Sequence, residues 1–136
     1  MPDPSDLNWL AILAATFVSG GLGAAWYSPA LFGPAWMTEL GLDAEALGPD
    51  GMAIGGSVFS CFVVAVSLAL LLGGLGIDTL LGGLGVGALV GFGIVAMTML
   101  SDALFSGWSA RLYAIQLGYR ALYLVLQGGI YAGWPF

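Results

Sequence analysis

Four long apolar stretches dominate the chain and are separated by shorter polar segments. They cover residues 7–27, 52–75, 79–101 and 112–134. Each stretch reaches the length of about 20 residues that a helix needs to cross the hydrocarbon core of a bilayer. Trp9 and Trp26 stand near the ends of the first stretch, and aromatic side chains prefer the headgroup level. The pattern predicts an all-α membrane protein, a single domain over residues 1–136 in which four transmembrane helices form a glycine-rich up-down bundle.

The largest polar segment, residues 28–51, begins with an apolar and aromatic elbow. Pro29 cannot continue the first helix, and Pro34 suits the first turn of a new one. We therefore predict a short helix over residues 34–40 that lies in the membrane interface. The candidate residues of this elbow are Trp26, Tyr27, Pro29, Phe32 and Trp36. They form either an aromatic anchor at headgroup level or the lip of a ligand site.

Small residues recur at every fourth position in three of the stretches, which places them on one face of each helix. The candidates for close helix packing are Gly83, Gly87, Gly91, Ser19 and Gly23. Small side chains let helix backbones approach each other, and van der Waals packing is what joins helices in lipid. The stripes predict tight helix contacts, either within one chain or between chains.

The fourth stretch differs from the others because polar side chains recur along it at intervals of three or four residues. They are Tyr113, Gln116, Arg120, Tyr123, Gln127 and Tyr131. This spacing puts all of them on one helix face, which we call the polar stripe. Because a polar face is costly in lipid, we expect the stripe to face the bundle interior, a subunit interface or a water-filled crevice.

Arg120 is the residue of this stripe that most needs a partner. It lies nine residues beyond Arg111, about 13 Å along the helix, and therefore near mid-membrane. An arginine there costs at least about 2.5–3.5 kcal/mol, and no acid lies in a predicted span at its depth. Its donors can tie helices together through Gln116, Tyr123, Gln127 or other oxygens. Alternatively, they can bind an anion or a lipid headgroup, or Arg120 can have a proton- or voltage-linked role.

Composition narrows the possible functions. Of the 136 residues, 60% are hydrophobic and 7% charged, against roughly 45–50% and 25% in an ordinary soluble domain. The net charge is −6 with only two basic residues, which excludes a nucleic-acid binder because phosphates attract Lys and Arg. The chain has no histidine and a single cysteine, Cys61, so the commonest general base and metal ligand is missing. We therefore expect no enzyme activity, no catalytic residue, no metal and no cofactor.

Orientation in the membrane is indicated by a single basic residue. Arg111 is the only Lys or Arg near the end of a predicted span, and such residues favour the cytoplasmic side. It assigns residues 102–111 and the long polar segment to that side. The two termini are then expected on the non-cytoplasmic side.

The sequence WYSPALFGPAWM at residues 26–37 resembles the signature of an uncharacterised integral membrane family, domain-of-unknown-function family 1761. Asn8 and residues 39–41, 104–105 and 118–120 are also similar to that family's pattern, so the resemblance covers essentially the whole chain. Pro34 departs from the pattern, because the family often has lysine there. The resemblance implies four spans in a bacterial inner membrane and supplies no activity.

Two functions remain open from the sequence. The first is a structural or accessory membrane protein that associates with copies of itself or with a larger membrane complex through its small-residue faces. The second is a permeation or binding protein for a small solute or anion, in which the polar stripe around Arg120 lines the pathway or pocket. The first is favoured because the chain has one intramembrane charge and shows no interrupted helix that would indicate a midplane site.

Overall fold

Residues 2–43, 45 and 50–135 are described by the structure, a computed structural model in which their regular elements are all helical. The elements in chain order are the 3₁₀ turn η1 (Pro4–Asp6), α1 (Trp9–Trp26), α2 (Gly33–Leu40), α3 (Gly51–Leu75), α4 (Leu80–Ala88), the π-helical segment η2 (Leu89–Val95), α5 (Ala96–Ser106) and α6 (Ala110–Ala132). The prediction of an all-α protein with a short helix after the first span is confirmed. Residues 44 and 46–49, part of the predicted polar segment, lie outside the described residues.

Three helices are long and apolar enough to cross a membrane. They are α1, α3 and the continuous helix Leu80–Ser106, which comprises α4, η2 and α5. α6 has 23 residues, a comparable length, but its polar stripe makes it less apolar than these three. The three apolar helices give the chain the composition of a multi-pass membrane protein.

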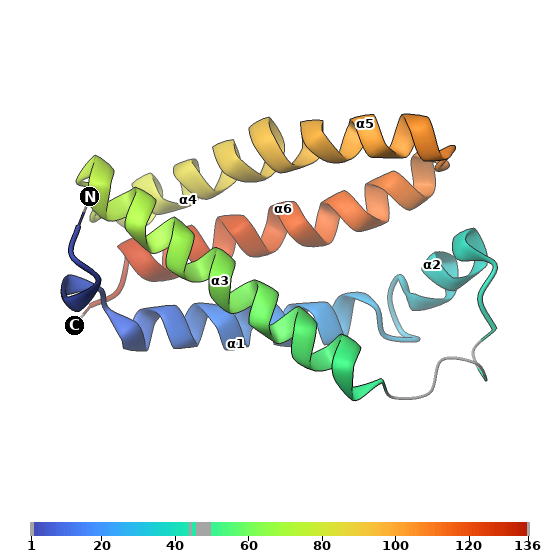
Figure 1. The fold of residues 1–136 in the computed structure, drawn as a ribbon, viewed down its shortest axis with the longest axis horizontal. Helices are drawn as coiled ribbons and strands as arrows, with labels where there is room; N and C mark the ends of the chain where they lie inside the picture. Colours follow the sequence, from blue (N-terminus) through green and yellow to red (C-terminus); the bar gives the residue numbers. More distant parts are fainter. Residues whose placement is uncertain (1, 44, 46–49, 136) are drawn as a thin grey trace.

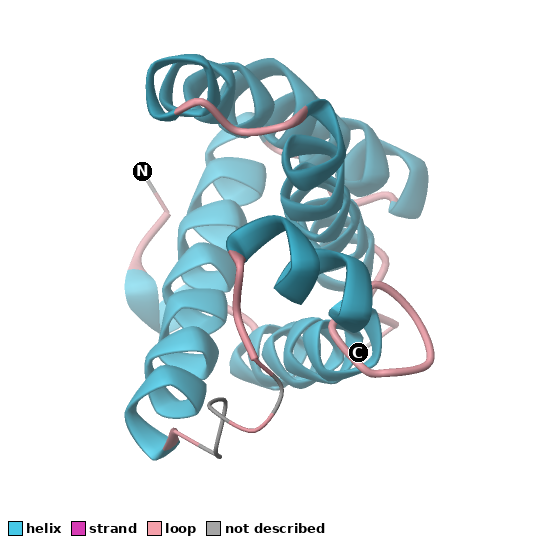
Figure 2. Ribbon diagram, turned by 90° about the vertical axis from the view of Figure 1, so that its right-hand side faces the viewer, coloured by secondary structure: helices cyan, strands magenta, loops and turns pink. Residues whose placement is uncertain are grey.

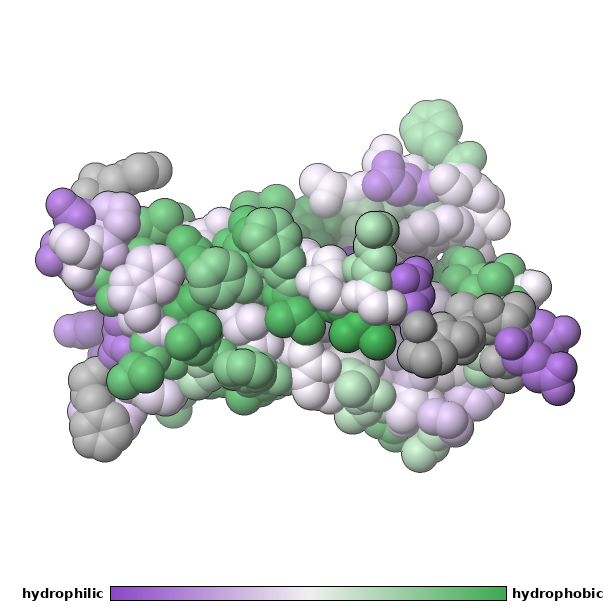
Figure 3. All heavy atoms as spheres, turned by 60° about the horizontal axis from the view of Figure 1, so that its bottom comes forward, coloured by the Kyte–Doolittle hydropathy of each residue, from purple (hydrophilic) through white to green (hydrophobic). Residues whose placement is uncertain are grey.

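The helices form a bundle whose long axis runs horizontally in Figure 1. α6 lies in the middle, with α1 on one side and the α4–α5 helix on the other, and α3 crosses over them diagonally. Both termini and the turn between α3 and α4 lie at one end, whereas α2 and the turn between α5 and α6 lie at the other. Figure 3 shows hydrophobic residues over the middle of the molecule and hydrophilic ones gathered mainly at its two ends, as in a protein that spans lipid.

The hydrophobic core lies in the half of the bundle that contains the termini. Ile12 and Ala15 of α1 form a buried cluster with Ala65 and Ala69 of α3. Towards its N-terminus α3 diverges from the other helices, and every residue from 51 to 60 is exposed. The bundle is therefore tightly packed at one end and open beside the N-terminal half of α3.

The glycine stripe of the third span packs against α6 of the same chain. A Cβ placed on Gly83 would overlap the carbonyl oxygen of Gly128, and one on Gly87 would lie 2.8 Å from the Cα of Val125. At Gly91 the corresponding distance to the Cα of Ala121 is 3.1 Å. At Gly83 and Gly87 the backbones are closer than any side chain between them would allow, so the contact depends on glycine there, and at Gly91 it is tight.

The third span differs from its prediction in two respects. The sequence predicts an end at residue 101, whereas the helix continues to Ser106 and ends at Gly107 (φ +70°), so that the exposed Asp102 lies within its last two turns. Its middle section, η2, is π-helical, which the sequence did not predict. The hydroxyl of Thr98 donates to the carbonyl oxygens of Ile94 and Val95 at 3.0 and 2.9 Å, which satisfies oxygens of the widened section.

Candidate functional site

The elbow between α1 and α2 turns the chain back over one end of the bundle, as Figure 2 shows from that end. The carbonyl oxygen of Trp26 accepts a hydrogen bond from the N–H of Phe32 at 2.9 Å. The N–H of Gly33 donates to the carbonyl oxygen of Ser28 at 3.1 Å. A Cβ on Gly33 would overlap the carbonyl oxygen of Tyr27 and lie 2.7 Å from that of Ser28, so this turn requires glycine.

The elbow is docked on α6. The indole Nε1 of Trp26 donates to the carbonyl oxygen of Ile115 at 3.0 Å. The Trp26 ring also lies against Gly118, where a Cβ would be only 2.7 Å from Cζ2 of the ring. Near the far end of α2, the hydroxyl of Ser109, the N-cap residue of α6, donates to the carboxylate of Glu39 at 2.5 Å. α2 and the elbow are thus held against the N-terminal half of α6.

Gln116 connects this elbow to Arg120. Its side-chain Oε1 accepts hydrogen bonds from the hydroxyl of Tyr27 at 3.1 Å and from Nη1 of Arg120 at 2.9 Å. The same Nη1 donates to the main-chain oxygen of Gln116 at 3.1 Å. The Tyr27 ring also contacts the ring of Trp36, with 5.2 Å between the centroids. The elbow and the polar stripe, which the sequence presents as two separate features, therefore meet in one site.

The guanidinium of Arg120 lies closer to the α2 end of the bundle than the Cα of the same residue. It reaches back one helical turn to Gln116, which is six residues from the start of α6, or about 9 Å along its axis. Long basic side chains commonly reach toward the headgroup region in this way. The charge therefore lies nearer the α2 end of the bundle than the Cα position of Arg120 alone indicates.

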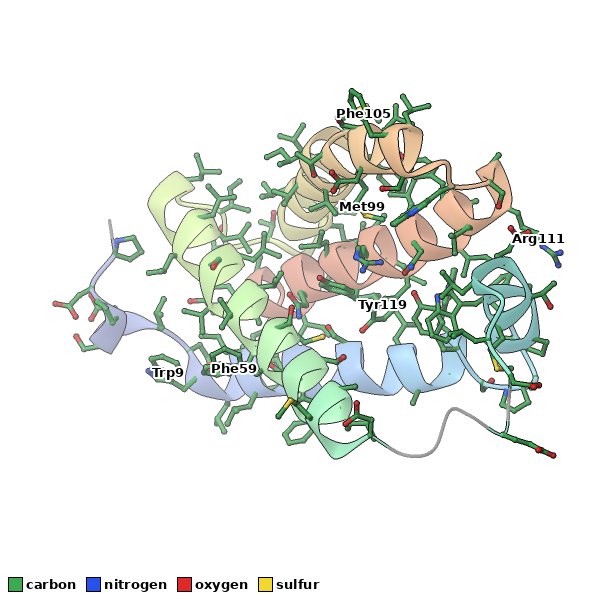
Figure 4. The ribbon with its side chains drawn as sticks, turned by 45° about the vertical axis from the view of Figure 1, so that its right-hand side comes forward. Trp9, Phe59, Met99, Phe105, Arg111 and Tyr119 are labelled. Atoms are coloured by element: carbon green, nitrogen blue, oxygen red, sulfur yellow. The ribbon has the colours of Figure 1, made fainter. Side chains whose placement is uncertain are left out.

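On the side of Arg120 that faces the termini, a layer of buried and hydrogen-bonded side chains fills the interior of the bundle. Gln127 is 1% exposed, and its Nε2 donates to the hydroxyl of Ser19 at 2.9 Å and to the carbonyl oxygen of Cys61 at 3.1 Å. The hydroxyl of Tyr119 donates to the carbonyl oxygen of Ser19 at 3.1 Å and lies 3.6 Å from Cys61 Sγ. Tyr123 is buried beside Tyr119, with 5.0 Å between ring centroids. This layer joins α6 to α1 and α3, and Figure 4 shows Tyr119 between α6 and α1.

The outer members of the stripe lie elsewhere. The hydroxyl of Tyr113 donates to the carbonyl oxygen of Ala96 at 2.7 Å, at the start of α5. Tyr131 packs against the core near the termini.

Gly23, one of the residues predicted to allow close helix packing, makes room for Tyr119, because a Cβ there would lie 2.8 Å from the Tyr119 hydroxyl.

A cavity of about 590 Å³ lies between α1, α2, α3 and α6, on the α2 side of the buried layer that contains Tyr119 and Gln127. We call it the Arg120 crevice. It is lined by Gly20, Gly23, Ala24, Tyr27, Trp36, Ala53, Ile54, Ser57, Val58, Cys61, Gln116, Tyr119 and Arg120. Its volume falls within the range of about 300–1,000 Å³ that is usual for small-molecule sites. Because its α3 wall comes mainly from the exposed N-terminal half of that helix, the crevice is open on this side.

A second cavity of about 240 Å³ lies further along α3, and we call it the α3 groove. It is lined by Val64, Ser67, Leu68, Leu71, Val90, Val95, Tyr123 and Leu124. The groove begins about one turn beyond Cys61 on α3 and about one turn beyond Arg120 on α6, the last residues of the crevice on these helices. The two cavities therefore share α3 and α6, while the crevice is completed by α1 and α2 and the groove by Val90 and Val95 of η2.

Two wall residues show what sequence reasoning could and could not find. Tyr119 was not predicted as a site residue because it stands beside the polar stripe rather than on it. It belongs to the segment 118–120 that resembles the family pattern, and the small residue Gly23, which makes room for it, lies on another helix. Trp36 was predicted as part of the elbow and also lines the crevice. Its buried Nε1 has no hydrogen-bond partner within the described residues. Of the other elbow residues, Pro29 lies outside the crevice, and Phe32 packs on Trp26 with 4.6 Å between ring centroids.

The electrostatics of the crevice are set by one cation. Among the residues that the structure describes, no Asp or Glu side chain pairs with Arg120, and both hydrogen bonds of its Nη1 go to Gln116. A half-buried cation is stabilised when an anion accepts its remaining hydrogen bonds. The same part of the chain contains no group of three or more His, Cys, Asp or Glu residues that could hold a metal ion.

Comparison with known proteins gives a family and no activity. A family model described as "Protein of unknown function (DUF1761)" matches residues 10–132. Searches of curated proteins and of solved structures found no match.

Proposed function

This chain belongs to the DUF1761 family, and because the function of that family is unknown, we propose from the geometry alone that the protein binds an anionic group in the Arg120 crevice. The chemical class of the bound group is a phosphate or carboxylate, which accepts the planar, multiple donors of a guanidinium. The protein is then a membrane-embedded binding protein rather than an enzyme.

The observation that carries this proposal is the half-buried Arg120 without a carboxylate partner in the described residues. Intramembrane basic residues generally pair with an acid or mark a binding site or pathway. Gln116, Tyr27 and Trp36 add polar and aromatic groups to the walls around the charge. Such a combination of mostly apolar walls and few convergent polar groups is typical of ligand sites.

Binding is better supported than permeation because the crevice has a floor. Gln127, Ser19 and Cys61 are buried and hydrogen-bonded directly below it, and the tightly packed core continues from there to the termini. A permeation path would need a chain of polar or hydrated groups through that half of the bundle. Its buried residues are instead mostly alanine, leucine and isoleucine.

We also propose that α6 is a fourth transmembrane helix. With 23 residues it is longer than α1, which has 18, and it contacts α1, α3 and α4, so lipid does not meet most of its polar stripe. Its lower hydropathy is explained by polar side chains that are buried or hydrogen-bonded inside the bundle. Together with Arg111, this proposal assigns both termini to the non-cytoplasmic side of a bacterial inner membrane.

Four crossings predict that the termini share one side of the membrane. In a Cys61→Ser background, single cysteines at Ser5 and at Pro135 should both react with a membrane-impermeant maleimide added to intact cells, while a cysteine at Thr38 should not. Labelling after lysis provides the control for reactivity at Thr38. Reaction of only one terminal cysteine in intact cells would contradict the fourth crossing.

The competing proposal is association with copies of itself or a larger complex through small-residue faces. Gly83, Gly87 and Gly91 contact α6 of the same chain, and Gly23 and Ser19 contact its residues Tyr119 and Gln127. These residues are therefore already occupied within one chain, which weakens the proposal that they form a docking surface. Native mass spectrometry of protein extracted in mild detergent tests for stoichiometric partners directly.

Arg120→Gln should weaken the binding of inorganic phosphate by about tenfold or more, because it removes a charge-assisted hydrogen bond. The measurement is the rise in unfolding temperature of the detergent-solubilised protein with phosphate concentration, since a ligand stabilises the state that binds it. Arg120→Lys keeps the charge but not the planar donors, and should lie between wild type and Arg120→Gln.

Arg111→Gln is the matched control, because it removes the same charge from an exposed position at the start of the same helix, outside the crevice. It should respond to phosphate like the wild type. If Arg120→Gln is folded and its response to phosphate equals that of Arg111→Gln, the proposed anion site is wrong.

A further inference from the structure

The walls of the crevice indicate from which side its ligand enters. The α3 wall consists mostly of residues within 53–61, and positions 51 to 60 are all exposed, with Ile54 at 59%. Their side chains are apolar or small, so in a membrane this opening faces lipid rather than water. The crevice is therefore accessible sideways from the bilayer.

The charge distribution at the α2 end disfavours entry of a soluble anion from water. Asp43, Glu45 and Asp50 lie on the segment between α2 and α3, at the same end of the molecule as the crevice, and the chain carries a net charge of −6. Like charges lower the local concentration of an anion that approaches from solution. An anion that is part of a membrane lipid avoids this barrier because it arrives within the plane of the bilayer.

The guanidinium and the α3 groove are placed to hold the two parts of a lipid. Arg120 donates to Gln116, about 9 Å from the start of α6, so its guanidinium lies in the half of the bundle nearer the α2 end. The α3 groove follows the crevice along α3 and α6 toward the opposite end of the bundle. Apart from Ser67 and the hydroxyl of Tyr123, its walls are aliphatic or aromatic, which suits a hydrocarbon chain.

We propose that the ligand of this site is an anionic membrane lipid, with its phosphate at Arg120 and an acyl chain in the α3 groove. This inference rests on the proposed anion site and adds the chain that accompanies the anion. The lipid enters from the bilayer past the exposed N-terminal half of α3, and its chain reaches the groove at the exposed residues Ser67 and Leu71 rather than through the buried layer. Selectivity for anionic over zwitterionic lipid follows from a single uncompensated cation.

The test uses the detergent-solubilised full chain and two probes, phosphatidylglycerol and inorganic phosphate, with phosphatidylcholine as the zwitterionic comparison. Lipid binding is read by native mass spectrometry and phosphate binding by thermal stabilisation. Ser67→Phe fills the groove without touching Arg120, and Val63→Phe, one turn away on α3 and outside both cavities, is its control.

Phosphatidylglycerol should bind about tenfold more tightly than phosphatidylcholine, and Arg120→Gln should remove the difference. Ser67→Phe should weaken phosphatidylglycerol about fivefold, the effect of displacing one or two methylene groups, and leave the phosphate response unchanged. Val63→Phe should change neither phosphatidylglycerol binding nor the phosphate response.

The lipid inference is overturned, while the anion site stands, if phosphate binding depends on Arg120 but Ser67→Phe behaves like Val63→Phe. The same conclusion follows if phosphatidylglycerol binds no more tightly than phosphatidylcholine. If neither probe depends on Arg120, both proposals fail.

Discussion

Gly87→Leu should destabilise the folded protein by about 3 kcal/mol, the upper end of the usual cost of overpacking a core. At this position α4 and α6 are separated by no side chain, because a Cβ would overlap the carbonyl oxygen of Leu124 and lie 2.8 Å from the Cα of Val125. Backbone atoms cannot move aside as a side-chain end can, so the two helices must separate. The measurement is unfolding of the purified protein in mixed detergent, followed by circular dichroism.

Gly85→Leu is the control for this variant. Gly85 is two residues away on α4, is exposed, and has no neighbouring atom within 4 Å of the place where a Cβ would lie, so leucine there should leave stability unchanged or raise it slightly through helix propensity. The pair also distinguishes packing within one chain from association between chains. If Gly87→Leu dissociated an oligomer while the monomer unfolded like the wild type, the stripe would serve association instead.

The sequence predicts which residues of α4 pack closely but not what they pack against. A four-residue spacing of Gly83, Gly87 and Gly91 defines one face of one helix, and it contains no information about the partner. The complementary positions on α6, Gly128 and Ala121, stand among larger residues and form no equally clear stripe. The choice between contacts within and between chains therefore depends on tertiary structure.

The polar stripe illustrates the same limit for the site. Its spacing correctly predicts that Arg120 and Gln116 share a helix face, because helical periodicity is local. Their connection to Tyr27 crosses 89 positions in the sequence and depends on how α1 packs against α6. The direction of the Arg120 side chain, which brings its charge closer to the α2 end, does not follow from the sequence.

The π-helical segment is the feature of the fold with the weakest sequence signal. The sequence of residues 89–95 is that of an ordinary apolar helix, and nothing in it predicts the wider π-helical turn that the structure shows. Thr98 satisfies two of its carbonyl oxygens, and Tyr113 of α6 donates to Ala96 just beyond it. Such local satisfaction of main-chain oxygens lets an irregular segment persist at membrane depth.

Gly33→Ala should weaken phosphate binding by about tenfold although it changes no residue that lines the crevice. The added methyl group would overlap the carbonyl oxygen of Tyr27 and approach that of Ser28 to 2.7 Å, so α2 must move by about an ångström to restore normal contact distances. Trp36 moves with α2, which changes its ring contact with Tyr27, now 5.2 Å between centroids, and displaces the Trp36 wall of the crevice. Arg120 and Gln116 keep their own hydrogen bond, since both lie on α6. The measurements are phosphate-dependent thermal stabilisation and tryptophan fluorescence.

Gly51→Ala is the matched control, because Gly51 starts α3 and has no atom within 4 Å of the position that a Cβ would take. It should bind phosphate like the wild type. A shifted tryptophan emission together with weakened binding in Gly33→Ala alone would show that the elbow holds the crevice in its binding shape. If Gly33→Ala moved the emission but bound phosphate normally, the anion would depend on α6 alone and the elbow would serve only as an interfacial anchor. The sequence allows two roles for the elbow, an aromatic anchor at headgroup level and the lip of a ligand site. The hydrogen bond between Tyr27 and Gln116 connects the elbow to Arg120, and this result would show that the elbow serves as an anchor without shaping the ligand site.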